Sequence, residues 1–510
     1  MAALIAGNAA GAFAQATVRA ENVRVGSAAE RYLRALSLTL PSDSTRWISR
    51  PLRAAPLVVT LARSAGPWGV DTSTRRWSVS AGVDLTLNTE RPTPQRDGSA
   101  WTGRGLNLRS FASIDWRRAG FSVRVAPVAW WAQNAAFELL PTFGPGNPYR
   151  DPLRPITIDL PQRFGPGAVA RLDPGESEIA WEGERLKVAL TSAAAHLGPA
   201  SDHSLLLQGD AGGYPRAVVS AGRLDTRVGD FTGEISWGRV AQSGFAYQQR
   251  AGALYTSYIS GTWRPAGISG RNVEIGMTRL TDIDWETLQL RDLLVPFGSI
   301  SETRVAGGTP RDDNQMASVF ARMRVPGIGV EFFTEYAKND RGKSMRDYIL
   351  EAEHGAAWLL GMQRAWRRDG MLWALNMTAV SGSISRITDF RFQSTFYDHF
   401  PLTQGHTLRG QLLGTPLLER EGGAELRLDR YHGGGAESLI LGTRSLNNEY
   451  AATVAPENLR QEWSAIFEVL RSRREGVWRW RVGGIADLGY SPVSGDAYSL
   501  HLSLGYSGGR

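Results

Sequence analysis

The sequence predicts an all-β fold, an antiparallel transmembrane up-and-down β-barrel of about 18 strands that follows a short N-terminal periplasmic helical segment. Three observations favour this fold: strands with one apolar face, alternation of short and long connections, and an even number of strands. In a barrel with an even number of strands, both ends of the barrel wall lie on the same side of the membrane.

The stretch "WSVSAGVDLTLN" at 77–88 alternates between apolar and polar residues. Its apolar positions are Trp77, Val79, Ala81, Val83, Leu85 and Leu87, and its other positions are Ser78, Ser80, Gly82, Asp84, Thr86 and Asn88. The segments at 120–131, 477–490 and 497–506 alternate in the same way, and their apolar faces carry no charge. Because a charge facing lipid near the midplane costs about 2–4 kcal/mol, we predict that these faces contact lipid and the opposite faces line a wet lumen.

The connections between these strands differ in length. Short turns are expected at 117–120, 367–370 and 472–476, and long polar stretches at 132–174, 282–314, 389–405 and 432–460. Strands are expected to begin near residues 75, 106, 119, 177, 214, 231, 252, 272, 315, 329, 348, 371, 406, 423, 461, 477 and 497, with one more after a turn at Gly183. This gives eighteen strands, and one merged or split hairpin would give 16 or 20. The alternation predicts tight periplasmic turns and long extracellular loops, with the N-terminus and the C-terminus both periplasmic.

The N-terminus predicts export, a helical segment and then the barrel. Residues 1–16 resemble a truncated signal peptide, with "AFA" before Gln15 as the cleavage site but no positively charged start. Residues 17–72 are expected to form the periplasmic segment and 73–510 the barrel. Ser27 and Glu30 form a capping box for a first helix, and a second is expected over 51–63. We expect these helices to cap or plug the barrel.

Composition excludes several classes of protein. The net charge is +7, but the basic residues are scattered and almost all are Arg, so we expect no nucleic-acid partner. The chain has no cysteine, which excludes disulfides, thiolate metal sites and cysteine catalysis. The mean hydropathy is −0.25, and no segment after the first twenty residues has the run of roughly 18 apolar residues that a membrane helix needs.

No motif predicts enzyme chemistry, a cofactor or a metal. "GYSGG" at 505–509 matches the pattern of a serine nucleophile but has no helix after it. Asp282, Asp284 and Glu286 have the spacing of a calcium loop, yet the required glycine and glutamate are missing. The seven histidines show no metal-binding spacing. We therefore expect a protein that is not an enzyme and that needs no cofactor.

Three regions carry a resemblance to a known family. They are "SAAERYLRALSLTLPSDSTRWISRPL" at 27–52, "IDLPQRFGPG" at 158–167 followed by "HLGPASDHSLLLQGDAGGYPR" at 196–216, and "DFRFQSTFYDHFPLTQGHTLRGQLLGTP" at 389–416. Together they resemble the capsule-assembly Wzi family of outer-membrane proteins. The sequence departs from that family at Leu197, where the family has tryptophan, and at 208–211, where it has "SNNA". The resemblance implies an eighteen-stranded outer-membrane barrel with periplasmic N-terminal helices, whose extracellular loops act as a lectin for capsular polysaccharide.

A lectin surface needs flat aromatic faces for sugar C–H groups and planar polar groups for hydroxyls and carboxylates. The candidate polysaccharide-binding residues are Tyr149, Arg150, Trp285, Arg311, Asp312, Tyr397, His399, His406, Arg409, Tyr431 and His432. They are densest over 396–409, which ranks first as a binding stretch. The sequence thus predicts a monomeric outer-membrane surface protein that anchors capsular or extracellular polysaccharide and whose other partners are outer-membrane lipids.

Two other functions remain open from the sequence. An outer-membrane porin or passive diffusion channel would have the same strands and an open lumen. A mechanical or adhesive barrel would neither conduct ions nor bind glycan tightly. The sequence does not distinguish loops that fold into the lumen from loops that do not, and it does not identify the sugar.

Overall fold

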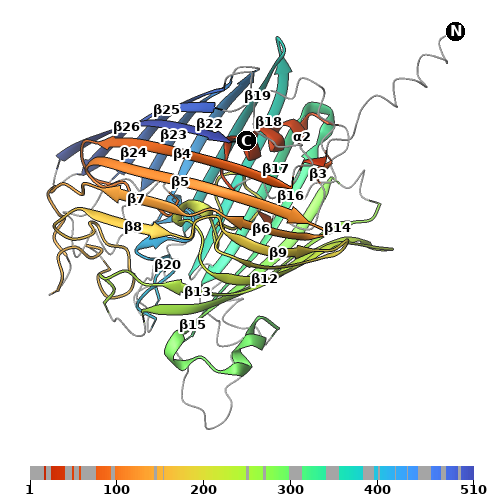
Figure 1. Ribbon diagram of the computed structural model, residues 1–510, viewed down its shortest axis with the longest axis horizontal. Coiled ribbons are helices and arrows are strands. Elements are labelled where there is room, and N and C mark those ends of the chain that lie inside the picture. Colours follow the sequence, from red (N-terminus) through yellow and green to blue (C-terminus); the bar gives the residue numbers. More distant parts are fainter. Residues whose placement is uncertain are drawn as a thin grey trace.

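In the computed structural model, the chain closes into an 18-stranded antiparallel β-barrel (Figure 1). The structure describes residues 17–18, 25–40, 49–50, 57–58, 76–92, 98–142, 146–152, 154–247, 252–267, 272–297, 313–339, 355–382, 396–399, 402–419, 421–432, 435–445, 461–472, 478–491 and 495–509. The predicted fold class is confirmed.

The barrel wall is formed by β4 (Trp77–Asn88), β5 (Gly105–Arg118), β6 (Phe121–Val125), β7 (Val128–Ala132), β8 (Val169–Asp173), β9 (Glu178–Glu182), β10 (Leu186–Thr191), β12 (Arg216–Thr226), β13 (Gly229–Ala241), β14 (Ala253–Pro265), β15 (Val273–Asp284), β16 (Asp313–Val325), β17 (Val330–Asn339), β18 (Ala356–Arg368), β19 (Met371–Gly382), β22 (Gly422–His432), β23 (Gly435–Ser445), β24 (Gln461–Ser472), β25 (Trp478–Ser491) and β26 (Gly495–Gly509). β6 and β7 together occupy one wall position, as do β8 and β9, and β26 pairs with β4 to close the barrel.

The two ends of the barrel differ in their connections. Tight turns join β5 to β6, β18 to β19 and β22 to β23 at one end, which we call the short-turn end. The first two turns place Ala119 with Gly120, and Asp369 with Gly370, at positive φ, as two-residue hairpin turns require. The opposite, long-loop end carries the long connections, including those after β7, β10, β15 and β19. β4 begins and β26 ends at the short-turn end; the periplasmic location of this end stays a prediction.

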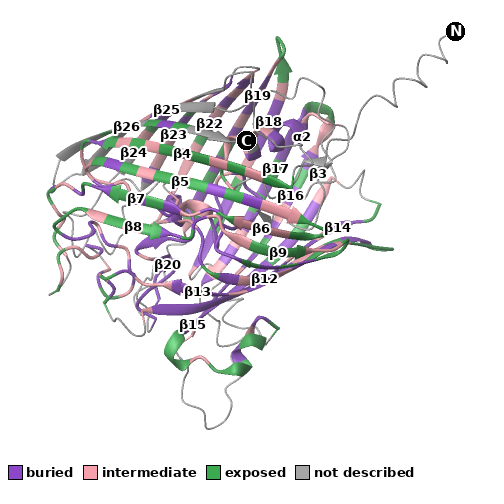
Figure 2. Cartoon of the chain, in the orientation of Figure 1, coloured by how far each residue is buried: buried purple, intermediate pink, exposed green. Residues whose placement is uncertain are grey.

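The strands present an apolar face outward, as their alternation predicts. In β4 the apolar side chains from Trp77 to Leu87 are exposed and the intervening side chains are more covered, which Figure 2 shows as alternating colours on the wall. Outward aromatic pairs lie at both ends of this band. Trp366 and Trp373 stack near the short-turn end with ring centroids 6.2 Å apart, and Tyr336 lies 5.6 Å from Trp358 near the long-loop end.

The predicted strand count is correct, but one predicted strand is not part of the wall and one wall strand was not predicted. The strand expected near 406 is instead a small hairpin inside the barrel, β20 (Thr407–Leu408) with β21 (Gln411–Leu412). The missing wall strand is β23, which falls within the stretch 432–460 that we expected to be a loop. Gly435, which begins β23, follows two further glycines in a stretch that resembles a loop in sequence, whereas Gly435 itself pairs with both β22 and β24.

The first predicted helix is confirmed as α2 (Ala28–Leu38), and its N-cap Ser27 accepts a hydrogen bond from the Glu30 backbone N–H. Of the second predicted helix, only β3 (Leu57–Val58) is described, and it pairs with β1 (Thr17–Val18). β2 (Ser49–Arg50) pairs with β11 (His196–Leu197). The proposed signal peptide at 1–16 is not among the described residues.

The core lies inside the barrel. At the long-loop end, buried side chains of residues 192–215 and 396–419 pack against lumen-facing wall residues such as Tyr258, Met316 and Phe333. At the short-turn end, α2 packs against Ala365 and Leu372 inside the same wall. Short 3-10 helices complete the described structure: η2 (Gly209–Ala211), η4 (Trp285–Thr287), η5 (Leu290–Phe297), η6 (Pro326–Ile328) and η8 (Pro416–Leu418).

Candidate functional site

Two connections at the long-loop end fold into the lumen. We call residues 192–215 together with the described residues of 396–419 the lumen plug. Both segments are almost entirely buried, and the backbone N–H of Gln208 in one donates to the carbonyl of Leu413 in the other at 2.7 Å. These segments contain about half of the sequence that carries the family resemblance, and this half forms part of the filling of the lumen.

Tyr397 lies at the centre of the lumen plug and is 1% exposed. Its hydroxyl donates to the Leu205 carbonyl at 2.9 Å and accepts from the Thr415 backbone N–H at 2.9 Å. Gly414 approaches so closely that a Cβ there would overlap the tyrosine hydroxyl. Burial raises the pKa of Tyr397 well above its usual value. These contacts hold the two plug segments together.

The histidines of this stretch are buried with Tyr397. The His406 ring stacks on Tyr397 with centroids 5.8 Å apart, and its Nε2 forms a hydrogen bond with the Leu206 carbonyl. His399 Nδ1 accepts from the Leu402 backbone N–H at 3.3 Å. These side chains do not lie on the surface where polysaccharide binding was expected, because Tyr397 and His406 lie inside the plug and His399 is buried at its edge.

Arg409 ties the plug to the wall. Its backbone has a φ of 51°, and its guanidinium pairs with the carboxylate of Asp173 at the end of β8. Burial lowers the pKa of Arg409, and the nearby charge of Arg171 lowers it further. The cation is committed to an ion pair with the wall, so it is a poor candidate for a surface contact to sugar.

In a third connection, the described residues of 133–168 after β7 lie over the plug. Arg154 bridges the connection and the plug, with Nη1 2.7 Å from Asp398 and Nη2 3.3 Å from Asp151. Asp159 accepts hydrogen bonds from the backbone N–H and hydroxyl of Ser243, and its own N–H donates to the Gln404 carbonyl at 2.9 Å. Burial raises the pKa of Asp159, and the Ser243 hydrogen bonds oppose that shift. The surface loops are thus fixed on a rigid base.

On this base, aromatic and guanidinium groups form what we call the rim cluster: Tyr149, Arg150, Arg163, Phe245 and Tyr247. Tyr149 packs edge-on against Phe245 with centroids 5.9 Å apart, and Arg150 lies 5.3 Å from the centre of the Tyr247 ring. Arg150 Nε also donates to the Phe245 carbonyl at 2.8 Å. Tyr247 is 45% exposed, and Tyr149 and Arg150 are half-buried. The cluster offers an accessible aromatic face beside a fixed cation.

The remaining candidate residues lie elsewhere. Trp285 is exposed at the start of η4, 5.4 Å from the Arg239 guanidinium on the outside of the wall. Tyr431 and His432 were expected in a long loop, but they lie in β22 at the short-turn end. There Tyr431 packs against Tyr32 of α2, and His432 contacts Glu437 at 3.1 Å. Arg311 and Asp312 fall in a part of the chain that the structure does not describe.

Sequence reasoning found Tyr149 and Arg150 but missed Arg163, Phe245 and Tyr247. The stretch "SGFAYQQR" at 243–250 begins with turn residues and carries two aromatic side chains, which is unusual for a solvated loop. The aromatic side chains of this stretch could therefore have been noted from the sequence. Their contact with 149–150 could not be predicted, because it depends on how two connections separated by β8–β13 fold over the plug.

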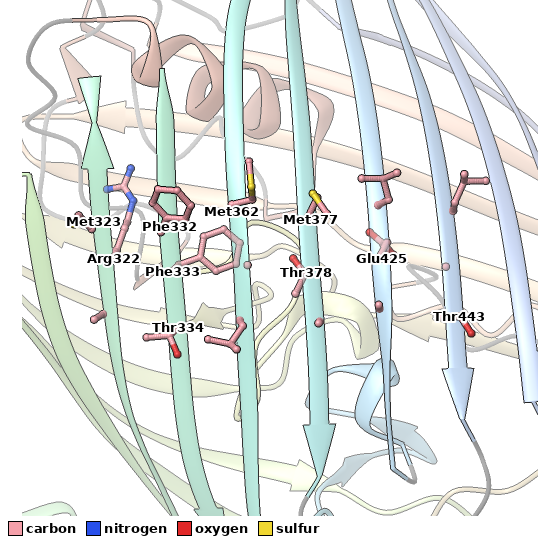
Figure 3. Close-up of a pocket in the computed structure, with 18 of the residues that line it drawn as sticks. Arg322, Met323, Phe332, Phe333, Thr334, Met362, Met377, Thr378, Glu425 and Thr443 are labelled. Carbon is pink, nitrogen blue, oxygen red and sulfur yellow. The ribbon is translucent and has the colours of Figure 1, made fainter. Parts of the chain in front are cut away.

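A groove lies on the outer wall, across β16 to β23, with a volume of about 950 Å³ (Figure 3). Outward-facing apolar side chains line it, among them Met323, Phe332, Leu360, Met377, Leu426 and Leu441, with small residues such as Ala321, Ala379 and Ala424 between them. Few polar groups face this groove, so it is not a candidate for sugar binding.

The described residues include no group of three or more acidic or histidine side chains placed to hold a metal ion. Asp282 and Asp284 make protein contacts instead: Asp282 accepts from the Thr256 hydroxyl at 2.6 Å, and Asp284 caps η4. Within the described helices, none has the length and apolar composition needed to cross a membrane.

Comparison with known proteins gives structural matches only. No family model and no curated protein matches the sequence. Among solved structures, the fold is similar to that of Wzi of Escherichia coli, described as an outer-membrane protein involved in group 1 capsule assembly and as a carbohydrate-binding β-barrel. The TM-score is 0.61 at 13% identity, over 93% of this chain and 97% of Wzi. OccAB3 of Acinetobacter baumannii matches with a TM-score of 0.42 at 9% identity, over 85% of this chain and 99% of that one. At these identities the likeness concerns the fold.

Proposed function

We propose that the protein is an outer-membrane surface protein that binds capsular or extracellular polysaccharide at its long-loop end and anchors it there. The outward apolar band between two sets of aromatic side chains is suited to a lipid bilayer. The fold similarity to a carbohydrate-binding barrel is consistent with this function. The sugar contacts come from the rim cluster and not from the plug.

The observation that carries this proposal is the pairing of Tyr247 with Arg150 on a rigid base. An exposed ring 5.3 Å from a guanidinium supplies both an apolar face for sugar C–H groups and a planar donor for hydroxyls or uronate carboxylates. Arg150 is already oriented by the Phe245 carbonyl, so little side-chain entropy is lost when glycan binds. A positively charged donor favours an acidic polysaccharide.

A diffusion channel is the alternative, and the lumen plug argues against it. A barrel of this size leaves an aqueous interior unless something fills it. Here the described residues of the plug form a continuous apolar core with the lumen-facing wall, and α2 packs against the inside of β18 and β19 at the short-turn end. We therefore expect no steady ion conductance from the folded protein.

Glycan binding tests the proposal directly. Purified detergent-folded protein is titrated with polysaccharide shed by its source cells, and planar-bilayer conductance is recorded on the same sample. Tyr247→Ala and Arg150→Ala should each weaken binding by about tenfold, because truncating an anchor residue typically costs 1–2 kcal/mol. Arg368→Ala removes an exposed arginine at the opposite end and should leave binding unchanged. Equal binding by all three variants, or steady conductance without saturable binding, would refute the glycan anchor.

A further inference from the structure

One segment of the long-loop end folds over the outside of the barrel. We call Trp285–Phe297, which contains η4 and η5, the outer flap. Trp237 Nε1 donates to the Leu293 carbonyl at 2.9 Å, and the Tyr255 hydroxyl donates to the Asp292 carbonyl at 3.3 Å. Both side chains face outward, since they alternate with the lumen-facing residues of β13 and β14. Figure 1 shows the flap beside β15, outside the wall.

The outer flap covers wall positions that would otherwise face the surroundings. Ser257, Thr281 and Ile283 are outward by register with Trp237 and Tyr255, yet all three are buried. Closer to the short-turn end of β15, the outward residues Ile275 and Met277 are exposed, as expected for a wall that no other segment covers. Two of the covered residues carry hydroxyl groups, which are costly to expose to hydrocarbon. The flap therefore removes polar wall surface from contact with the surroundings.

In exchange, the flap exposes apolar side chains of its own. Leu290 is 84% exposed, Leu294 66% and Phe297 64%. Asp292 is turned inward, where its Oδ2 accepts from the Gln289 N–H at 2.6 Å, while Arg291 is exposed. Figure 2 shows η5 as mostly exposed. Such a run of large apolar side chains is not expected on a water-facing loop.

The flap lies at the level of the membrane boundary. Trp237 and Tyr255 belong to the outward aromatic residues near the long-loop end, and Trp263 on β14 stacks with Phe231 near the short-turn end. Tyr255 and Trp263 are eight residues apart on β14. At about 3.3 Å per residue and a strand tilt of about 40°, this spans roughly 20 Å along the barrel axis, close to the apolar band of about 25 Å in such barrels.

We propose that the outer flap is an interfacial membrane anchor whose Leu290, Leu294 and Phe297 insert among the acyl chains of the surrounding lipid leaflet. Its exposed face continues the apolar outer wall, and its polar backbone groups contact the wall at the level where aromatic side chains meet the lipid headgroups. The inference uses the membrane location but not the glycan site. A second protein molecule seated on the same face is the competing occupant.

The absence of cysteine makes a site-specific test simple. Leu294→Cys is labelled with a nitroxide, and the folded protein is reconstituted in phosphatidylethanolamine–phosphatidylglycerol vesicles. Collisional access to oxygen and to a water-soluble nickel chelate is then measured. Leu360→Cys, on the exposed outer face of β18, gives the value for lipid, and Arg291→Cys gives the value for the polar side of the flap. Access of the chelate to Leu294 should be on the order of tenfold lower than to Arg291, because a charged or strongly polar solute enters hydrocarbon poorly.

Three results would overturn the proposal. Equal chelate access at Leu294 and Arg291 would place the flap in water. Protection of Leu294 together with spin–spin broadening that grows with the protein-to-lipid ratio would show a second copy on the flap. High chelate access at Leu360 would show that the wall itself is not in the bilayer, which refutes the membrane location as well. Phe297→Cys provides the same measurement if the Leu294 variant does not fold.

Discussion

The segments inside the two ends of the lumen are held by different interactions. At the long-loop end, the lumen plug packs apolar side chains such as Leu205, Leu206 and Leu413 against Met316 and Phe333 of the wall. At the short-turn end, α2 also has an apolar contact, but its position is set by a buried charge. The plug is therefore held mainly by buried apolar surface, whereas the position of α2 is set by a directional ion pair.

The charged contact centres on Glu331 of β17. Arg34 of α2 donates two hydrogen bonds to Glu331 Oε1, from Nη2 at 2.7 Å and from Nε at 3.0 Å. Arg322 on the neighbouring strand pairs with the same carboxylate at 2.6 Å. Arg34 Nη2 also donates to the Pro199 carbonyl of the plug, so one guanidinium joins helix, plug and wall.

The two kinds of contact should contribute differently to the stability of the fold and to the position of the helix. Apolar burial stabilises in proportion to area and tolerates small shifts, whereas a buried ion pair contributes little net free energy but is costly to break. The plug should therefore account for most of the resistance to opening, and the Arg34 contact should fix where the helix lies.

The largest effect is expected from a charge inside the plug. Leu206→Asp places a carboxylate at a position with no exposed surface, where an unpaired charge costs several kcal/mol. We expect a lower unfolding temperature and, in planar bilayers, steady conductance, whereas we expect none from the unaltered protein.

Leu206→Met is the matched control, because a volume-conserving apolar exchange usually costs less than about 1.5 kcal/mol. It should keep the lumen closed. If Leu206→Asp also stays closed and unfolds at the same temperature, the plug is not part of the core.

A smaller effect is expected at the helix. Arg34→Met removes the guanidinium and leaves Glu331 with Arg322, so we expect a loss of up to about 3 kcal/mol, the lower end of the cost of breaking a buried pair. The helix should become more accessible to protease while the plug keeps the conductance low. Arg31→Met on the same helix breaks the less buried pair with Glu468 and should cost under about 1 kcal/mol. Equal protease sensitivity of the two variants would contradict a placing role for Arg34.

Much of the wall could be predicted from the sequence, because outward and inward positions alternate with a period of two and the turns use recognisable residues. β4 and the turn at 367–370 are examples. The errors at 406 and 435–445 have one cause. Short apolar runs next to glycines can form a wall strand or a lumen hairpin, and only the pairing partners decide between them.

The candidate site was harder to predict. Tyr149 with Arg150 and Tyr397 with His406 look alike in sequence, since each pair combines an aromatic ring with a nitrogen-bearing polar side chain near other turn residues. One pair lies at the rim and the other in the plug. What separates them is the folding of one connection beneath another, through contacts such as Arg154–Asp398, and residue types do not encode which connection lies deeper.

The last prediction compares the tyrosine buried in the plug, Tyr397, with the exposed tyrosine of the rim cluster, Tyr247. Tyr397→Phe keeps the ring that fills the plug but leaves the Leu205 carbonyl and the Thr415 N–H without their hydroxyl partner. Leaving buried polar groups unpaired costs about 1–3 kcal/mol, so the free energy of unfolding should fall by that amount in detergent. Conductance should stay at baseline because the plug keeps its shape.

Tyr247→Phe changes an exposed hydroxyl in the rim cluster, and its effect on stability should stay within about 0.5 kcal/mol. If Tyr397→Phe instead weakened glycan binding with no change in stability, then Tyr397 would contact sugar and the assignment of the site to the rim cluster would be wrong.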